Sequence, residues 1–368
     1  MPATQNRGPR SRLSGDPDRI EVLEPLRKSL GEVSETADQF EQARALLRAI
    51  ERVSHTHAAD PICAGTPAEL TQRDERRLAR RRLVACAVRG LAQDRCGSEG
   101  RRLMSVRGNE GQCALVTGAS AGIGLELARV LAANRFSLVL LARNRDKVQE
   151  LARELKTSHA TKVTIVAADL REPAAPEAVF DSLKSAGVRV DLLVNNAGLL
   201  FEGPAGAIGL DDQLRLLQVN VVAMTALTRL FLAPMLERNH GRILNVASVA
   251  AFMPVPNLAV YAASKAYVLS FGEALSQELS GSKVTLTTLC PGVTDTGMVH
   301  GTNLGNMPSM MIMDAKTVAQ EGYRACMAGK PVHVAGLANE LAVQWIKYQP
   351  SWLLRAIGGV FGKAGPPN

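Results

Sequence analysis

The stretch that decides the fold is Ala114-Leu115-Val116-Thr117-Gly118-Ala119-Ser120-Ala121-Gly122-Ile123-Gly124. Its apolar beginning predicts a short β-strand, and the amphipathic residues 125–133 that follow predict a helix. In the turn between them, Gly118 permits a tight bend, Gly122 lets the backbone approach a pyrophosphate, and Gly124 lets the helix pack closely on the strand. The N-terminus of such a helix presents unpaired N–H groups to phosphate. The stretch therefore predicts a strand, a phosphate-binding turn and a helix.

Three more apolar runs, at residues 137–142, 163–168 and 190–194, predict further strands. They end in polar or small residues, namely Arg143, Asp169-Leu170 and Asn195-Asn196-Ala197-Gly198. In an open parallel sheet, ligands bind at the carboxyl ends of the strands. The pattern predicts a doubly wound α/β domain of the Rossmann type, with a mainly parallel sheet and helices on both faces.

Arg143 follows the second strand at the position where the adenosine ribose of a dinucleotide should lie. A carboxylate there would bind the ribose 2′-hydroxyl of NAD, whereas an arginine suits the 2′-phosphate of NADP. Arg145 lies nearby. The sequence therefore predicts NADP(H) in preference to NAD(H), although solvated arginines at a helix start remain an alternative.

Tyr261 and Lys265 lie four residues apart, and Ser248 precedes Tyr261 by thirteen residues. At helical spacing the phenol and the ammonium share one face. The cation can then lower the tyrosine pKa from ~10 toward the range of an acid or base catalyst. Alone, such a pair is more often a solvated helix face. Together with Ser248 and the glycine turn, it predicts proton transfer at a hydride-transfer site.

From about residue 110 to at least 300, the chain resembles the short-chain dehydrogenase/reductase family. The shared motifs are the turn at residues 117–124, Asn195-Asn196-Ala197-Gly198, Asn220, Ser248, Tyr261 with Lys265, and Pro291-Gly292 followed by Thr296. No catalytic position is substituted. One departure is Ala121, where many NADP-preferring relatives carry a basic residue, so Arg143 is the main support for a 2′-phosphate.

The resemblance implies a role for each catalytic residue. Tyr261 is the general acid in carbonyl reduction and the base in alcohol oxidation. Ser248 orients the carbonyl oxygen. Lys265 binds the nicotinamide ribose and lowers the tyrosine pKa, while Asn220 anchors a water in a proton relay. The expected cofactor-binding residues are Gly118, Ser120, Ala121, Gly122, Ile123, Gly124, Arg143, Asp169, Leu170, Asn196, Ala197, Gly198, Tyr261, Lys265, Pro291, Gly292, Val293 and Thr296, with Thr294 as a competitor of Thr296.

The resemblance thus implies an NADP(H)-dependent carbonyl reductase or alcohol dehydrogenase that forms a homodimer or homotetramer. A cofactor-binding sensor or scaffold without catalysis is the alternative. Such proteins usually lose a proton-transfer residue, whereas this sequence retains Ser248, Tyr261 and Lys265. That retention favours the enzyme.

Three regions are expected along the chain: residues 1–103, 104–335 and 336–368. Before Met104 the only lysine is Lys28, and residues 76–82 are dense in arginine. This shift in composition predicts a basic extension, poorly ordered or partly helical, ahead of the catalytic domain. It is either an arm for anionic partners or sequence upstream of a natural start at Met104, and both readings stay open.

Two features point to a lipophilic substrate. Methionines gather after Pro291-Gly292, at Met298, Met307, Met310, Met311 and Met313. They predict a pliable lid over an apolar molecule, or side chains packed against the core. The apolar tail at residues 341–357 carries two tryptophans and two cations. It suits a peripheral membrane segment, a contact with a partner subunit, or a cover over its own substrate site.

Charge, cysteines and histidines exclude several other classes. About half of the formal charge of +8 comes from the extension, and no aromatic residues interleave its arginine run, so nucleic-acid binding is not expected. The six cysteines show no metal or disulfide spacing, which favours a reducing cytoplasm. The six histidines form no convincing ligand set, so no metal is expected.

Overall fold

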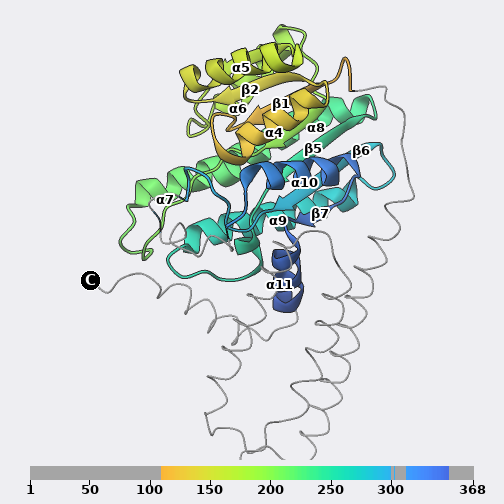
Figure 1. Cartoon of the computed structure of the whole chain (residues 1–368). Helices are drawn as coiled ribbons and strands as arrows, with labels where there is room; N and C mark the ends of the chain where they lie inside the picture. Colours follow the sequence, from red (N-terminus) through yellow and green to blue (C-terminus); the bar gives the residue numbers. More distant parts are fainter. Residues whose placement is uncertain (1–108, 300–301, 303–311, 348–368) are drawn as a thin grey trace, which may run out of the picture. The chain divides into compact units, whose positions relative to one another are not determined.

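The structure is a computed structural model that describes residues 109–299, 302 and 312–347 (Figure 1). The predicted extension at residues 1–103, Met307, Met310, Met311 and the tail beyond residue 347 lie outside the described residues.

A seven-stranded parallel sheet forms the centre of the described domain. Its strands are β1 (Cys113–Thr117), β2 (Ser137–Ala142), β3 (Val163–Ala167), β4 (Leu192–Asn195), β5 (Gly241–Val246), β6 (Val284–Cys290) and β7 (Val332–Val334). The order is β3-β2-β1-β4-β5-β6-β7, and each neighbouring pair is parallel. The direction of winding reverses between β1 and β4, where Val116 pairs with Val194. Such a switch point is where doubly wound sheets bind ligands.

Helices cover both faces of the sheet, as the sequence predicted. One face carries α4 (Gly122–Ala133), α5 (Arg145–His159) and α10 (Ala315–Met327), whose buried side chains include Leu131, Leu155 and Val318. The other face carries α6 (Ala175–Ser185), α8 (Met224–Glu237) and α9 (Ala259–Glu278). In Figure 1, α4 and α10 lie side by side in front of the strands. The doubly wound α/β fold is confirmed.

One helical run joins α7 (Leu210–Leu217), the π-helix η1 (Gln218–Ala223) and α8. Its length and apolar composition would allow residues 210–237 to cross a membrane, yet 50% of its most apolar window is buried in the domain. Leu227, Phe231 and Met235 pack in the core beneath the sheet. This packing accounts for the apolar composition of the run.

Two shorter elements complete the region around the carboxyl ends of the strands. The 3-10 helix η2 (Val249–Phe252) follows β5 and begins at Ser248, whose Oγ accepts a hydrogen bond from the Ala250 N–H at 3.2 Å. Helix α11 (Leu337–Lys347) follows β7 after a turn at Gly336, which has a φ of +79°. Both elements contribute residues to the cavity at the carboxyl ends of the strands.

Candidate functional site

A cavity of about 1080 Å³ opens at the carboxyl ends of the strands. This volume reaches the upper end of the roughly 300–1,000 Å³ typical of small-molecule sites. The predicted site residues that line it are Gly118, Ser120, Ala121, Gly122, Ile123, Arg143, Asp169, Leu170, Asn196, Ala197, Gly198, Ser248, Tyr261, Lys265, Pro291, Gly292, Val293 and Thr296. Gly124 and Asn220 do not line the cavity themselves but contact residues that do. The structure thus brings the predicted cofactor and catalytic residues to one cavity.

The glycine turn between β1 and α4 has no room for side chains. Gly118 and Gly122 have φ values of +68° and +57°, in the left-handed region that favours glycine. A Cβ on Gly122 would lie 2.8 Å from Thr296 Cγ2, and one on Gly124 would lie 2.5 Å from the Gly118 carbonyl oxygen. Ala121 caps α4 without a side-chain hydrogen bond. The first N–H groups of α4 therefore remain available to a phosphate, and the turn fits a dinucleotide pyrophosphate.

Thr117 and Asn196 join the ends of β1 and β4 beside this turn. Thr117 Oγ1 donates to the Val194 carbonyl at 3.1 Å and accepts from the Asn196 and Ala197 N–H groups, each at 3.0 Å. Asn196 Nδ2 donates to the Thr117 carbonyl at 2.9 Å. These bonds hold the floor of the cavity at the switch point of the sheet.

Asp169 faces a neighbouring arginine that the sequence reasoning missed. Arg171 Nε donates to the two carboxylate oxygens of Asp169 at 3.0 and 2.8 Å, and the Arg171 N–H donates to Oδ1 at 3.0 Å. Hydrogen bonding from Arg171 is the largest influence lowering the pKa of Asp169, and the charge of Arg143 lowers it further. Arg143 and Arg171 therefore lie on the same side of the cavity. A carboxylate two residues before an arginine in a turn is the sequence pattern that could have predicted this pairing.

Tyr261 and Ser248 meet inside the cavity. Burial is the largest influence on the pKa of Tyr261 and raises it, and hydrogen bonding from the Ser248 hydroxyl acts in the opposite direction. Ser248 comes from the end of β5, and Tyr261 comes from the first turn of α9. Two hydroxyl groups thus converge where a polar atom of a ligand can contact both.

Lys265 lies one turn further along α9 with its ammonium 5.7 Å from the centre of the Tyr261 ring. Its Nζ donates to the Val246 carbonyl at 2.9 Å. Burial lowers the pKa of Lys265 to about 8.

Asn220 lies in the π-helix η1, within the helical run that joins α7 and α8. Its Oδ1 accepts from the Leu199 N–H at 2.8 Å, and its Nδ2 donates to the Leu199 carbonyl at 3.0 Å and to Ser264 Oγ at 3.1 Å. A Cβ on Gly198 would lie 3.4 Å from Asn220 Oδ1 and 3.7 Å from Lys265 Nζ. Asn220 therefore positions the chain at Gly198 and Leu199 beside Lys265.

The two candidate threonines after Pro291-Gly292 differ in their contacts. Thr294 Oγ1 donates to the Gly292 carbonyl at 3.0 Å, and Thr294 forms a β-bridge with Met313. Thr296 lies against Gly122 at the phosphate-binding turn. Both line the cavity, but the geometry at the turn favours Thr296 as the cofactor contact.

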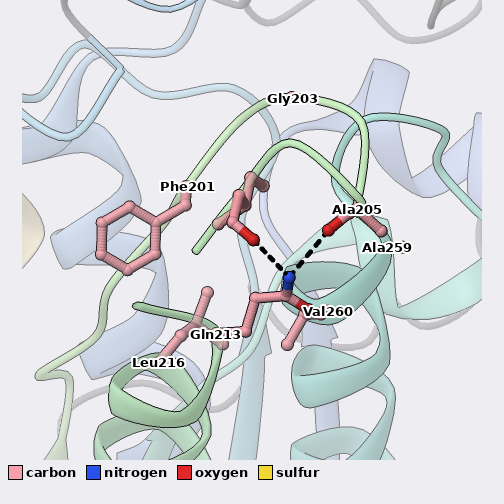
Figure 2. A pocket seen from close by; sticks show the side chains of 8 residues that line it. Phe201, Gly203, Ala205, Gln213, Leu216, Ala259 and Val260 are labelled. Carbon is pink, nitrogen blue, oxygen red and sulfur yellow. Dashed lines mark hydrogen bonds between the residues drawn. The ribbon is translucent and has the colours of Figure 1, made fainter. Parts of the chain in front are cut away.

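Only the beginning of the loop at residues 199–210 lines the cavity, through Leu199 and Leu200. Figure 2 shows the Gln213 amide nitrogen beneath this loop, donating to the Ala205 and Ile208 carbonyls, each at 2.8 Å. Phe201, Gly203 and Ala205 instead line a separate cavity of about 10 Å³, room for about one water molecule. The tip of the loop therefore faces this small cavity.

The described methionines after Gly292 divide between the two expected roles. Met298 lines the cavity and is 40% exposed, whereas Met313 is buried in the core. The cavity wall also includes residues from α11, at the start of the predicted tail. In the described part of the chain, no group of three or more His, Cys, Asp or Glu residues could hold a metal ion.

Residues 112–306 match the model of the short chain dehydrogenase family. The chain belongs to this family. It is 29% identical over 248 residues to the very-long-chain 3-oxoacyl-CoA reductase of Rattus norvegicus, covering 65% of this chain and 78% of that protein.

Solved structures of the family are also similar to it. A short-chain dehydrogenase from Sphingobium yanoikuyae in complex with NADPH is 28% identical, with a TM-score of 0.59 over 68% of this chain and 95% of that one. A short-chain dehydrogenase/reductase from Burkholderia phymatum in complex with NAD is 27% identical, with a TM-score of 0.57 over 64% of this chain and 92% of that one. This short-chain dehydrogenase is therefore an oxidoreductase that acts on CH–OH or C=O groups with a nicotinamide cofactor.

Proposed function

We propose that this short-chain dehydrogenase reduces the carbonyl group of a lipophilic ketone, or oxidises the matching secondary alcohol, with NADP(H) as its preferred cofactor. The observation that carries the proposal is that Ser248, Tyr261 and Lys265 line the same cavity as the glycine turn. A carbonyl oxygen between the two hydroxyls accepts a hydrogen bond from each. This arrangement suits proton transfer to a substrate oxygen.

Tyr261 donates its proton to the carbonyl oxygen in the reductive direction, and Ser248 holds that oxygen in place. The bound nicotinamide supplies the hydride in reduction and accepts it in oxidation. Because burial raises the pKa of Tyr261, the phenol remains protonated at neutral pH, as a proton donor must. A positioned acid of this kind contributes roughly 10²- to 10⁴-fold to the rate.

Lys265 binds the nicotinamide ribose and stabilises the phenolate that Tyr261 becomes after it gives up its proton. The support is its burial beside Tyr261 and its position near Gly198, where an added Cβ would lie 3.7 Å from Lys265 Nζ. Asn220 takes part in proton supply by positioning Gly198 and Leu199, since its amide is already bonded to Leu199 and Ser264. This positioning is compatible with the water in a proton relay that the family resemblance implies at Asn220.

Arg143 selects NADP(H) by pairing with the 2′-phosphate, and Arg171 supports it. Both arginines line the same part of the cavity, and Asp169, the nearby carboxylate, is neutralised by Arg171. A free carboxylate would repel the phosphate, whereas a paired one leaves the local charge positive. Arginine is well suited to bind phosphate through two parallel hydrogen bonds.

The proposal of a lipophilic substrate is supported by Met253, Val255, Leu258 and Met298, which are apolar residues of the cavity lining. The similarity to a very-long-chain 3-oxoacyl-CoA reductase points the same way. A 3-oxoacyl thioester presents a ketone next to a long apolar chain. We take compounds of this type as the leading substrates to test.

The enzyme also forms a homo-oligomer through α7, η1 and α9 in this proposal. Four apolar side chains remain exposed on these elements: Leu210 (69%), Leu214 (52%), Val222 (49%) and Tyr267 (39%). Contact with a second copy would bury them. Sedimentation of Leu214→Glu should yield smaller particles than the unaltered chain, and equal sizes would contradict this interface.

A cytoplasmic location is proposed because Cys113, Cys290 and Cys326 are free thiols.

The test is NADPH consumption with 3-oxoacyl thioesters and simple ketones of increasing chain length, repeated with NADH. We expect turnover that rises with chain length and a higher kcat/KM for NADPH than for NADH. Turnover confined to small polar ketones would contradict the lipophilic substrate, and equal use of both cofactors would contradict the NADP(H) preference.

A further inference from the structure

Helix α11 contributes a wall to the catalytic cavity although it lies beyond the segment that matches the family model. Among its residues, Ala342, Val343, Trp345 and Ile346 line the cavity together with Asn339. We propose that Trp345 is a specificity-determining residue whose indole limits the length and bulk of the apolar chain that the substrate carries. This inference rests on the proposed function and names the element that sets its substrate range.

The structure ties α11 to the core at its beginning. Glu321 on α10 accepts hydrogen bonds from the Gly336 N–H at 3.0 Å and interacts with His333 Nε2 at 3.0 Å. Asn339 Nδ2 donates to the Ala335 carbonyl at 2.9 Å and contacts Met313 Sδ at 3.1 Å. These bonds give α11 a defined position against β7 and α10. A wall held in this way can discriminate between substrates by shape.

Two further contacts place α11 against the catalytic groups. A Cβ on Gly292 would overlap the Asn339 amide nitrogen, so the helix start lies against the Pro291-Gly292 turn. At the other end, Lys347 Nζ lies 5.3 Å from the centre of the Phe252 ring. Phe252 closes η2, the short helix that begins at Ser248. Helix α11 therefore spans from the cofactor side of the site to the element that carries Ser248.

The chemistry of this part of the cavity identifies the occupant as hydrocarbon. The cavity-lining residues of α11 carry no charge, and Met253, Val255 and Leu258 are also apolar. The cations that line the described cavity are Arg143, Arg171 and Lys265, which belong to the cofactor and catalytic parts. Lys347 at the end of α11 is not part of the lining, so a charged head group would find no counter-charge among the α11 residues that line the cavity, whereas each methylene buried there would raise kcat/KM roughly fourfold.

Trp345 is the residue of this wall whose shortening opens the most space. An indole is large and rigid, and removing it leaves room for several methylene groups without altering the backbone of the helix. Val343 is only 2% exposed, so its side chain anchors the helix on the core. Trp345 is therefore the better position for changing specificity without loosening α11.

The first experiment compares Trp345→Ala and Trp345→Phe with the unaltered chain on 3-oxoacyl thioesters of graded length. We expect Trp345→Ala to raise the ratio of kcat/KM for the longest to that for a medium chain by about tenfold, with Trp345→Phe in between. The KM for NADPH should stay unchanged. Gln344→Ala, a neighbouring change outside the cavity lining, is the matched control and should leave the ratio unaltered. An unchanged ratio in Trp345→Ala would overturn the inference.

A second experiment measures ligand binding beside α11 through the fluorescence of Trp345, without the need for turnover. The chain contains two tryptophans, so Trp352→Phe in the full chain leaves Trp345 as the sole indole emitter. Titration with a long-chain alkyl ketone should change its emission, and bound NADPH should quench it by energy transfer. A response without any turnover would contradict the proposed function but support the α11 site. Normal turnover without a fluorescence response to the ketone would overturn the α11 inference and leave the proposed function standing.

Discussion

Asn220 and Leu199 are joined by a reciprocal pair of hydrogen bonds, from the Leu199 N–H to Oδ1 at 2.8 Å and from Nδ2 to the Leu199 carbonyl at 3.0 Å. An amide side chain here replaces the backbone partner that a neighbouring strand would offer. Asn220 is 2% exposed, and its amide satisfies both backbone groups of the partly buried Leu199. The pair connects the π-helix to the chain that follows β4.

Replacing Asn220 by alanine should therefore weaken both folding and catalysis. Each buried group left without a partner costs about 1–3 kcal/mol, so we expect the free energy of unfolding to fall by at least that amount. Displacement of Gly198 and Leu199 from Lys265 should also lower kcat. Asn220→Asp keeps the acceptor and loses the donors, so it should show an intermediate loss. Denaturant unfolding and steady-state kinetics measure both effects, and full stability in Asn220→Ala would contradict this role.

The pH dependence of carbonyl reduction should report Lys265. Burial lowers its pKa to about 8, so the folded enzyme loses the ammonium as the pH rises through about 8. Tyr261 titrates higher because burial raises its pKa. If the ammonium is required, kcat/KM should be constant below pH ~8 and decline above it.

A matched variant identifies the group responsible for that decline. In Lys265→Arg the cation cannot lose its proton, so the activity that remains should show no decline near pH ~8. The profile is measured as kcat/KM at saturating NADPH across the alkaline range. A decline that persists unchanged in Lys265→Arg would assign it to another group.

Cofactor preference should depend on Arg143. Losing a hydrogen-bonded partner of the 2′-phosphate should weaken NADPH binding by roughly tenfold or more, and the carboxylate of Arg143→Asp adds repulsion. NADH binding should change little. Arg171→Gln should shift the preference in the same direction, because it also frees the Asp169 carboxylate. Binding titrations with both cofactors need no substrate, and unchanged NADPH affinity in Arg143→Asp would refute the assignment.

Gly124 should not tolerate a side chain. Its added Cβ would lie 2.5 Å from the Gly118 carbonyl oxygen, so α4 would have to move away from β1. We expect Gly124→Ala to reduce the free energy of unfolding by about 1–3 kcal/mol and to weaken cofactor binding. Gly206→Ala is the control, since a Cβ there meets nothing within 4 Å. Equal stability of both variants by thermal unfolding would contradict the close packing.

Strands β1 to β4 and the helical pairing of Tyr261 with Lys265 could be predicted because their signals are local. Apolar runs of strand length end in glycine or polar residues at Gly118 and Asn196, and helical spacing alone aligns Tyr261 with Lys265. The π geometry around Asn220 could not be predicted, because apolar periodicity hardly separates one turn of π-helix from α-helix.

The sequence left open whether the tail at residues 341–357 covers its own substrate site, contacts a partner subunit or lies on a membrane, because contacts between distant segments decide this. Helix α11 lines the cavity only because β7 and Glu321 bring residue 336 next to the carboxyl end of β6. The pairing of Asp169 with Arg171 left a weak local signal, but its effect on the charge near Arg143 required the neighbouring strands β2 and β3 to be placed. Tertiary packing decides both features.

The most direct test of the account is NADPH consumption by the unaltered chain and by Tyr261→Phe on the same long-chain 3-oxoacyl thioester, with NADPH binding measured in parallel. We expect Tyr261→Phe to bind NADPH normally and to lose roughly 10²- to 10⁴-fold in kcat. Equal turnover by the two proteins would contradict Tyr261 as the proton donor, and with it the proposed mechanism.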